Sequence, residues 1–185
     1  YRPVSPPQKI VNQFPKGFNI LFAGNIGNSQ SFDTVVEAFN LIKEQNINII
    51  VLGSGRDKKR IETKIDDLGL SNRFHFLGSH PPEIMPKYFA AADALLITLK
   101  KADIFSYTIP GKLQSYLACG KPIIGALDGI GKQIIEESNS GLCSNAEDVE
   151  GLSGNIIKMK KMSSKELLTF GNNGLYYFNN HFNKH

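Results

Sequence analysis

The chain has 185 residues, of which 41% are hydrophobic and 21% charged, a composition that fits one globular domain with a real core. Its net charge is +4, and the basic residues are spread out apart from one short cluster at 56–60, whereas a nucleic-acid-binding protein needs a continuous basic face. Cys119 and Cys143 show neither metal nor disulfide spacing, so no metal ion is expected and a reducing, cytoplasmic compartment is the default. No apolar run approaches the roughly 20 residues of a membrane span. The charge still allows a loose attraction to an anionic membrane surface.

The opening segment, "YRPVSPPQK" (1–9), is rich in proline and does not resemble a signal peptide. Because it also lacks an initiator methionine, we interpret residues 1–16 as a linker in a piece of a larger protein.

Beyond residue 16, short apolar runs alternate with amphipathic stretches. The apolar runs predict strands at 18–24, 47–53, 74–78, 94–99, 121–126 and 141–145. The stretches between them predict helices at 31–45, 56–70, 82–93, 111–120, 131–138 and 146–161, with Pro86 in the first turn of the third. Strands that alternate with helices and are apolar on both faces indicate a parallel sheet covered on both sides. Residues 17–161 are therefore predicted to form a Rossmann-like, doubly wound α/β domain of about six strands.

The tail, 162–185, is expected to be helical and to break at "GNNG". It then gathers large apolar side chains within eight positions: Leu175, Tyr176, Tyr177, Phe178 and Phe182. Two interpretations stay open. The tail either packs as a last helix on its own domain, or it forms a surface for a missing partner domain, in which case residues 175–182 would pack poorly here.

The loop "GNIGNSQ" (24–30) follows the first predicted strand, and ligands of an open parallel sheet bind beyond the carboxyl ends of its strands. Gly24 and Gly27 would let backbone N–H groups approach a ligand, and Asn25 and Gln30 offer side-chain amides. A tight strand-to-helix turn without function explains the same residues.

The loop "GSGRDK" (53–58) follows the second strand. Gly53 and Gly55 match two glycines of the dinucleotide-binding fingerprint, but Lys58 stands where the third belongs, and no acidic residue ends the next strand. This mismatch argues against the interpretation of the chain as an NAD-dependent oxidoreductase. Arg56 can be a phosphate ligand or a solvated residue of the turn.

The loop "GSHPP" (78–82) follows the third strand. It carries Ser79 and His80 in a rigid turn of small residues. The main chain of such a turn could hydrogen-bond the edge of a flat base.

The stretch "DIFSYTIPGK" (103–112) is the most informative, because a helix begins at its end on Pro110 and Gly111. Lys112 falls in the first turn, where its charge opposes the helix dipole unless an anion such as a phosphate lies nearby. Hydroxyls that suit a sugar precede it: Ser106, Tyr107 and Thr108. No Ser-His-Asp set, no paired catalytic carboxylates and no carboxylate cluster for magnesium accompany these groups. The pattern predicts a domain that binds a phosphorylated ligand and supplies half of an active site.

Taken in order, four segments resemble the C-terminal, donor-binding half of a retaining GT-B glycosyltransferase of the bacterial capsule and O-antigen type: "FAGNIGNSQSFDTVVEAF", "IIVLGSGRDKKRIE", "FHFLGSHPPEIMPKYFAAADALLITL" and "TIPGKLQSYLACGKPIIG". The chain is most similar to fucosamine-transferase-like enzymes, which carry an Ile-Pro-x-Lys segment before an Ala-x-Gly-Lys-Pro-Ile helix end. The resemblance implies a hexosyltransferase of surface polysaccharide or lipopolysaccharide biosynthesis that uses a nucleotide-sugar donor, with UDP as the expected nucleotide and no cofactor. It also implies a missing N-terminal acceptor domain and peripheral association with the cytoplasmic face of the inner membrane.

By the same resemblance, the segment from Gly24 to Gly27 faces the interdomain cleft, Ser79 and His80 lie beside the nucleobase, and Lys112 with the start of its helix holds the diphosphate. Two departures from the family are expected to matter. Many members place Arg and Lys at the positions of Asn25 and Gln30, and two glutamates, one near the sugar and one on the ribose, at the positions of Ser106 and Ser115. A serine hydroxyl bonds a sugar less strongly than a carboxylate does. Lys112 and Ser106 are the catalytic candidates.

Electrostatic stabilisation of the leaving diphosphate is the mechanism that these residues imply. The chain alone is expected to be inactive, because it has no acceptor domain. An alternative function is a noncatalytic nucleotide-sugar-binding module that presents the donor to a separate partner chain.

Overall fold

The chain forms a six-stranded sheet with the strand order β3-β2-β1-β4-β5-β6, and every neighbouring pair is parallel. This computed structural model describes residues 1–183. The strands are β1 (Phe18–Ala23), β2 (Ile47–Leu52), β3 (Phe74–Gly78), β4 (Ala94–Thr98), β5 (Ile123–Ala126) and β6 (Gly141–Ser144). The predicted doubly wound, Rossmann-like fold is confirmed.

The strand order reverses between β1 and β4. β1 pairs with β2 over all six of its residues, but with β4 only over Ile20–Phe22. Beyond Phe22 the two central strands are no longer paired, and the chains that leave them diverge. In a sheet of this kind the crevice at the carboxyl ends of the central strands is where ligands bind.

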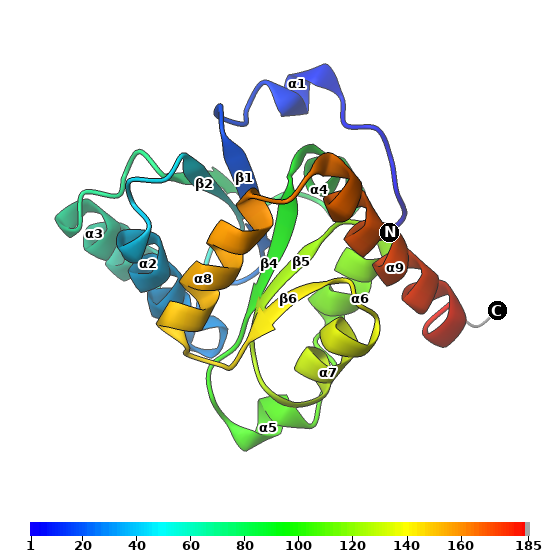
Figure 1. Ribbon diagram of the computed structural model, residues 1–185. Helices are drawn as coiled ribbons and strands as arrows, with labels where there is room; N and C mark the ends of the chain where they lie inside the picture. The colour runs from blue at the N-terminus through cyan, green and yellow to red at the C-terminus, as the bar shows by residue number, and fades with distance from the viewer. Residues whose placement is uncertain (184–185) are drawn as a thin grey trace.

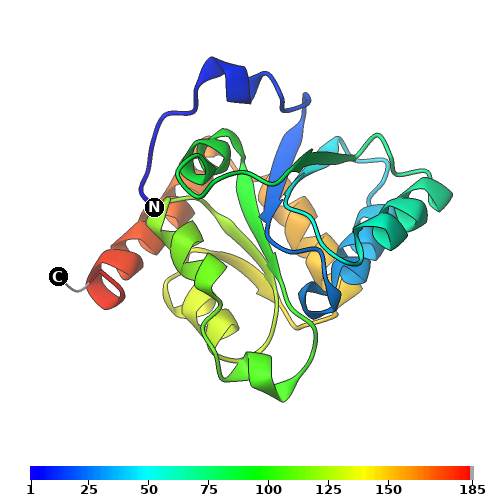
Figure 2. The ribbon, with the colours of Figure 1, turned by 180° about the vertical axis from the view of Figure 1, so that it is seen from behind.

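Helices cover both faces of the sheet (Figures 1 and 2). α2 (Phe32–Leu41), α3 (Lys58–Asp67) and α8 (Val149–Lys160) pack on one face, whereas α4 (Met85–Ala91), α6 (Gly111–Ala118) and α7 (Gly129–Glu137) pack on the other. Successive residues of a strand point to opposite faces. Phe22 therefore joins the first core, under α2, α3 and α8, and Leu21 the second, under α4, α6 and α7, which is why the strands are largely apolar on both faces.

Each of the six predicted helices differs in extent from the structure by a few residues at one or both ends. The helix expected at 31–45 is shorter, because the backbone leaves helical geometry at Ile42, and a 3-10 turn, η1 (Asn28–Gln30), precedes it. The helix expected at 82–93 is α4, with Pro86 in its first turn as predicted. A short helix, α5 (Asp103–Ser106), was not predicted.

The segment 1–16, expected to be a linker, lies against the face formed by α4 and α6. It contains a short helix, α1 (Gln8–Val11), whose Ile10 is buried. Tyr88 of α4 donates a hydrogen bond of 3.2 Å from its hydroxyl to Gln13 Oε1. Part of this segment thus belongs to the second hydrophobic core.

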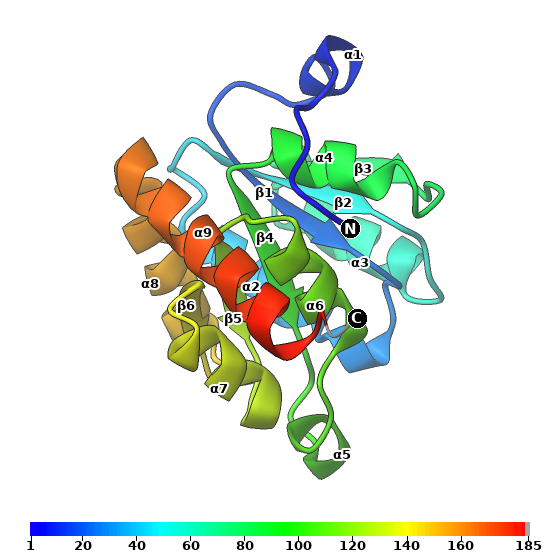
Figure 3. The same cartoon turned by 90° about the vertical axis from the view of Figure 1, so that its right-hand side faces the viewer.

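The tail is a single helix, α9 (Ser164–His181), so the break predicted at "GNNG" is wrong. Gly171 and Gly174 are buried, and a Cβ at Gly171 would overlap the carbonyl oxygen of Gly120, so the glycines allow α9 to lie directly against the end of α6 (Figure 3). Ser163 and Glu166 form a capping box that fixes the start of α9.

The aromatic cluster of the tail is divided between core and surface. Tyr177, Phe178 and Phe182 pack partly against the core beneath α6, whereas Tyr176 is 73% exposed. Residues 184–185 of the expected tail lie outside the described residues, and docking of α9 on another domain stays a prediction. None of the helices described is long and apolar enough to cross a membrane.

Candidate functional site

The loops after β1 and β2 are bonded to each other at the carboxyl edge of the sheet. The backbone N–H of Ile26 donates to the Ser54 carbonyl over 2.9 Å. A Cβ at Gly53 would overlap the Gly24 carbonyl, and one at Gly55 the Ile26 carbonyl. The two glycines that resemble a dinucleotide fingerprint are therefore required by this close approach of two loops.

Lys112 lies where these loops meet the start of α6. Its Nζ donates a hydrogen bond to Gln30 Oε1 and lies 4.3 Å from the centroid of the Phe22 ring. It also lies against Gly24, where a Cβ would be only 2.8 Å from Nζ. None of the carboxylates in the described part of the chain forms a salt bridge with it. Burial lowers the pKa of Lys112 to about 8.

Gln30 is held by hydrogen bonds to the loop after β1 and to the end of β4. Its N–H donates to the Gly27 carbonyl over 3.0 Å, and its own carbonyl accepts a bond of 2.5 Å from the hydroxyl of Thr98, a fully buried residue at the end of β4. The loop after β1 is thereby attached to β4. This attachment keeps the Gln30 amide over Lys112.

The start of α6 is open for an anion. Pro110 is its N-cap residue, no side chain caps the helix, and open space surrounds Gly111. The first N–H groups of an uncapped helix lack intrahelical partners and carry partial positive charge. Together with the Lys112 ammonium, which has only neutral partners, they make this point electrostatically suited to a phosphate.

A cavity of about 400 Å³, within the size range of small-molecule sites, opens at Gly24, the glycine against which Lys112 Nζ lies. Several predicted residues line it: Gly24, Asn25, Gly53, Ser79 and His80. His80 is fixed by a bond of 3.0 Å between its Nε2 and the Leu77 carbonyl, and its ring packs on Tyr88. Tyr1 also lines this cavity, and the sequence analysis did not single it out.

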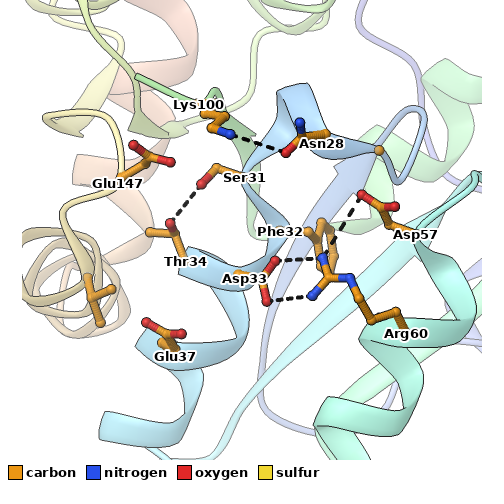
Figure 4. A pocket seen from close by; sticks show the side chains of 12 residues that line it. Asn28, Ser31, Phe32, Asp33, Thr34, Glu37, Asp57, Arg60, Lys100 and Glu147 are labelled. Carbon is orange, nitrogen blue, oxygen red and sulfur yellow. Dashed lines mark hydrogen bonds and ion pairs between the residues drawn. The ribbon is translucent and has the colours of Figure 1, made fainter. Parts of the chain in front are cut away.

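A second hollow, of about 290 Å³, lies around the start of α2 (Figure 4). Four carboxylates line it, those of Asp33, Glu37, Asp57 and Glu147, against two basic side chains, Arg60 and Lys100. Asp33 accepts bonds of 2.9 and 2.7 Å from Arg60, which lower its pKa to about 2, and Lys100 donates over 3.4 Å to Asn28. Gly27 lines this hollow and, with Asn25 and Arg56, an adjoining one. Because its carboxylates outnumber its basic side chains and would repel a diphosphate, we place the candidate site at Lys112 instead.

The hydroxyl residues before α6 lie apart from the cavity beside Lys112. The backbone of Ser106 packs against Gly129, Tyr107 is 78% exposed, and the Thr108 hydroxyl donates to the Ile104 carbonyl over 3.2 Å. Ser115, one turn into α6, donates to the Gly111 carbonyl over 3.5 Å. Within residues 1–183, no three His, Cys, Asp or Glu side chains gather as metal ligands would.

Residues 7–175 match the family described as glycosyl transferases group 1. The chain belongs to this family. It is 26% identical over 140 residues to the putative colanic acid biosynthesis glycosyl transferase WcaI of Escherichia coli K12, in an alignment that covers 74% of this chain and 34% of WcaI. The chain thus spans about a third of the length of that curated relative.

Two solved structures, one of them from a protein described as a group 1 family glycosyl transferase, share the fold. The C-terminal domain of LpcC from Francisella tularensis superposes with a TM-score of 0.80 at 18% identity, covering 98% of this chain and 95% of that domain. HepE of Anabaena, in complex with UDP and glucose, superposes with a TM-score of 0.77 at 19% identity, covering 98% of this chain and 52% of HepE. The expected likeness to the C-terminal half of a GT-B glycosyltransferase is confirmed.

Proposed function

We propose that this group 1 glycosyl transferase domain binds the donor of a retaining glycosyltransferase, which moves a hexose from a UDP-sugar to a glycan or lipid-linked acceptor in surface polysaccharide biosynthesis. The observation that carries the proposal is the Lys112 ammonium, desolvated, without a carboxylate partner and beside the uncapped start of α6. UDP in the HepE complex supports the choice of nucleotide.

The proposed mechanism follows from these groups. A diphosphate placed between the 24–30 loop and α6 would receive hydrogen bonds from Lys112 and the first N–H groups of the helix, with the nucleoside in the adjoining cavity. These donors favour the charge that develops on the leaving diphosphate, which lowers the barrier to sugar transfer. Because Asn25 and Gln30 are neutral, Lys112 carries most of this charge stabilisation.

The experiment compares Lys112→Met with the unchanged chain, because methionine keeps an apolar stem and removes the charge. Calorimetry should show UDP affinity falling about tenfold or more, since a charge-assisted hydrogen bond is worth roughly 1.5–3 kcal/mol and each 1.4 kcal/mol is a factor of ten. Uridine, which has no phosphate, should bind both proteins alike. Equal UDP affinity would mean that the diphosphate does not lie at Lys112.

A noncatalytic donor-binding module is the second candidate function. Ser106 and Ser115 favour it, because they stand where the resemblance places two glutamates. The two functions are separated by joining the chain to an acceptor domain and assaying sugar transfer. Transfer that depends on Lys112 supports the enzyme, whereas tight donor binding without transfer supports the module.

A further inference from the structure

Tyr1 brings an aromatic ring into the donor cavity, and we propose that the nucleobase of the donor stacks on this ring. The inference rests on the proposed function and adds a binding residue to it. Tyr1 lines the same cavity as Gly24, Gly53, Ser79 and His80, although it belongs to the segment expected to be a linker.

The N-terminal segment runs along the sheet from the cavity at the carboxyl ends of the strands to the beginning of β1. Its helix α1 lies near the beginning of β1, whereas the first residues run in front of the sheet between α4 and α6 (Figures 1 and 3). Pro3 Cγ lies within 3.6 Å of the position that a Cβ on Gly120 would occupy, at the end of α6. Tyr1, two residues before Pro3, lines the cavity.

The Tyr1 ring is supported from behind. It stacks on Phe89 of α4 with centroids 5.9 Å apart and planes inclined by 16°, and Phe89 is only 2% exposed. Phe89 in turn packs edge-on against Tyr116 of α6, with centroids 5.2 Å apart. One face of the Tyr1 ring therefore lies toward Phe89, which Tyr116 supports from the other side.

The rest of the ring is free for a ligand, because Tyr1 is 54% exposed and borders the cavity. A nucleobase that enters from Lys112 would find the ring on one side and the backbone of the 78–80 turn at its edge. Every base offers a π-face for such stacking.

The test measures binding of UDP and uridine to the 185-residue chain and its variants, all with the same start methionine, by calorimetry or by displacement of UDP. Tyr1→Leu should weaken both ligands by the same factor, about tenfold, because base stacking does not involve the phosphates. Tyr1→Phe keeps the ring and should bind within about twofold of the unchanged chain. Tyr176→Leu, which removes an exposed tyrosine from α9, is the matched control and should change neither affinity.

Unchanged binding of both ligands by Tyr1→Leu would overturn the stacking proposal, and so would a Tyr1→Phe variant as weak as Tyr1→Leu, since the hydroxyl would then be the binding group. Loss of UDP binding in Lys112→Met beside normal binding in Tyr1→Leu would leave the proposed function standing without the stacking. If the unchanged chain bound neither ligand, both proposals would fall. The contrast is sharp because Lys112→Met should weaken UDP alone, whereas Tyr1→Leu should weaken uridine as well.

Discussion

Lys112 is a residue on which folding and ligand binding make opposite demands. Burial lowers its pKa to about 8 from a model-compound value of 10.5, so the folded chain disfavours the ammonium that a diphosphate would need. Between those two pH values the unfolded chain binds more protons than the folded chain. The contribution of Lys112 to the free energy of unfolding therefore rises with pH across this window. Below pH 8 the lysine is charged in both states, and the fold bears the full cost of burying its ammonium.

Lys112→Met should accordingly melt at the same temperature as the unchanged chain or slightly higher at pH 7. Its advantage should shrink toward pH 10, where the lysine of the unchanged chain is largely neutral in the fold. Scanning calorimetry of both proteins without ligand at the two pH values measures this difference. A gap in melting temperature that stays constant with pH would show that Lys112 keeps its ordinary pKa.

At the scale of single residues, the sequence predicted the position of Lys112 but not its partners. A Pro-Gly helix start is a local signal, so the first turn of α6 could be assigned from nearby residues. Gln30 and Phe22 meet Lys112 only because the sheet places β1 beside β4, and that neighbour relation has no local signal. Tyr1 was missed because a proline-rich segment carries no periodicity.

The interface between α6 and α9 depends on a glycine inside a helix, where glycine is unfavourable by about 1 kcal/mol relative to alanine. Gly171→Ala should nevertheless destabilise the chain, because the new Cβ would overlap the Gly120 carbonyl and push α9 from α6. Gly154→Ala is the matched control in α8, with open space around the glycine, and should stabilise by about 0.5–1 kcal/mol. Urea denaturation of both variants gives the comparison. Equal stabilisation by the two alanines would disprove the close contact.

Among the elements, the six strands could be predicted because each is apolar on both faces and closed by small or turn residues. The tail was predicted wrongly for a physical reason. Local propensity places a break at 171–174, but burial against Gly120 outweighs it, and that contact is invisible in the sequence. α5 has four residues, too few for a helical period, and α2 ends early at a backbone change that its side chains do not signal.

For the whole molecule, the two hydrophobic cores are built from residues of this chain on both faces of the sheet. We expect the chain to fold by itself and to bind UDP weakly, but to transfer nothing, because its alignment covers only 34% of WcaI and the proposed function assigns the acceptor to another domain. Incubation with UDP-sugars and simple or lipid-linked acceptors, followed by mass spectrometry, checks this. Sugar transfer at an appreciable rate by the chain alone would refute the proposal that this chain binds only the donor.

Gly24 and Lys112 lie far apart in the sequence, yet they share one small volume. The Lys112 Nζ would lie 2.8 Å from a Cβ at position 24, and the φ of +151° at Gly24 favours glycine whatever residue stands at 112. In evolutionary terms the lysine can be exchanged without freeing position 24, whereas a side chain at position 24 would meet both a strained backbone and the ammonium. Divergence toward another donor would then begin on α6, and the glycine of the loop after β1 would be kept.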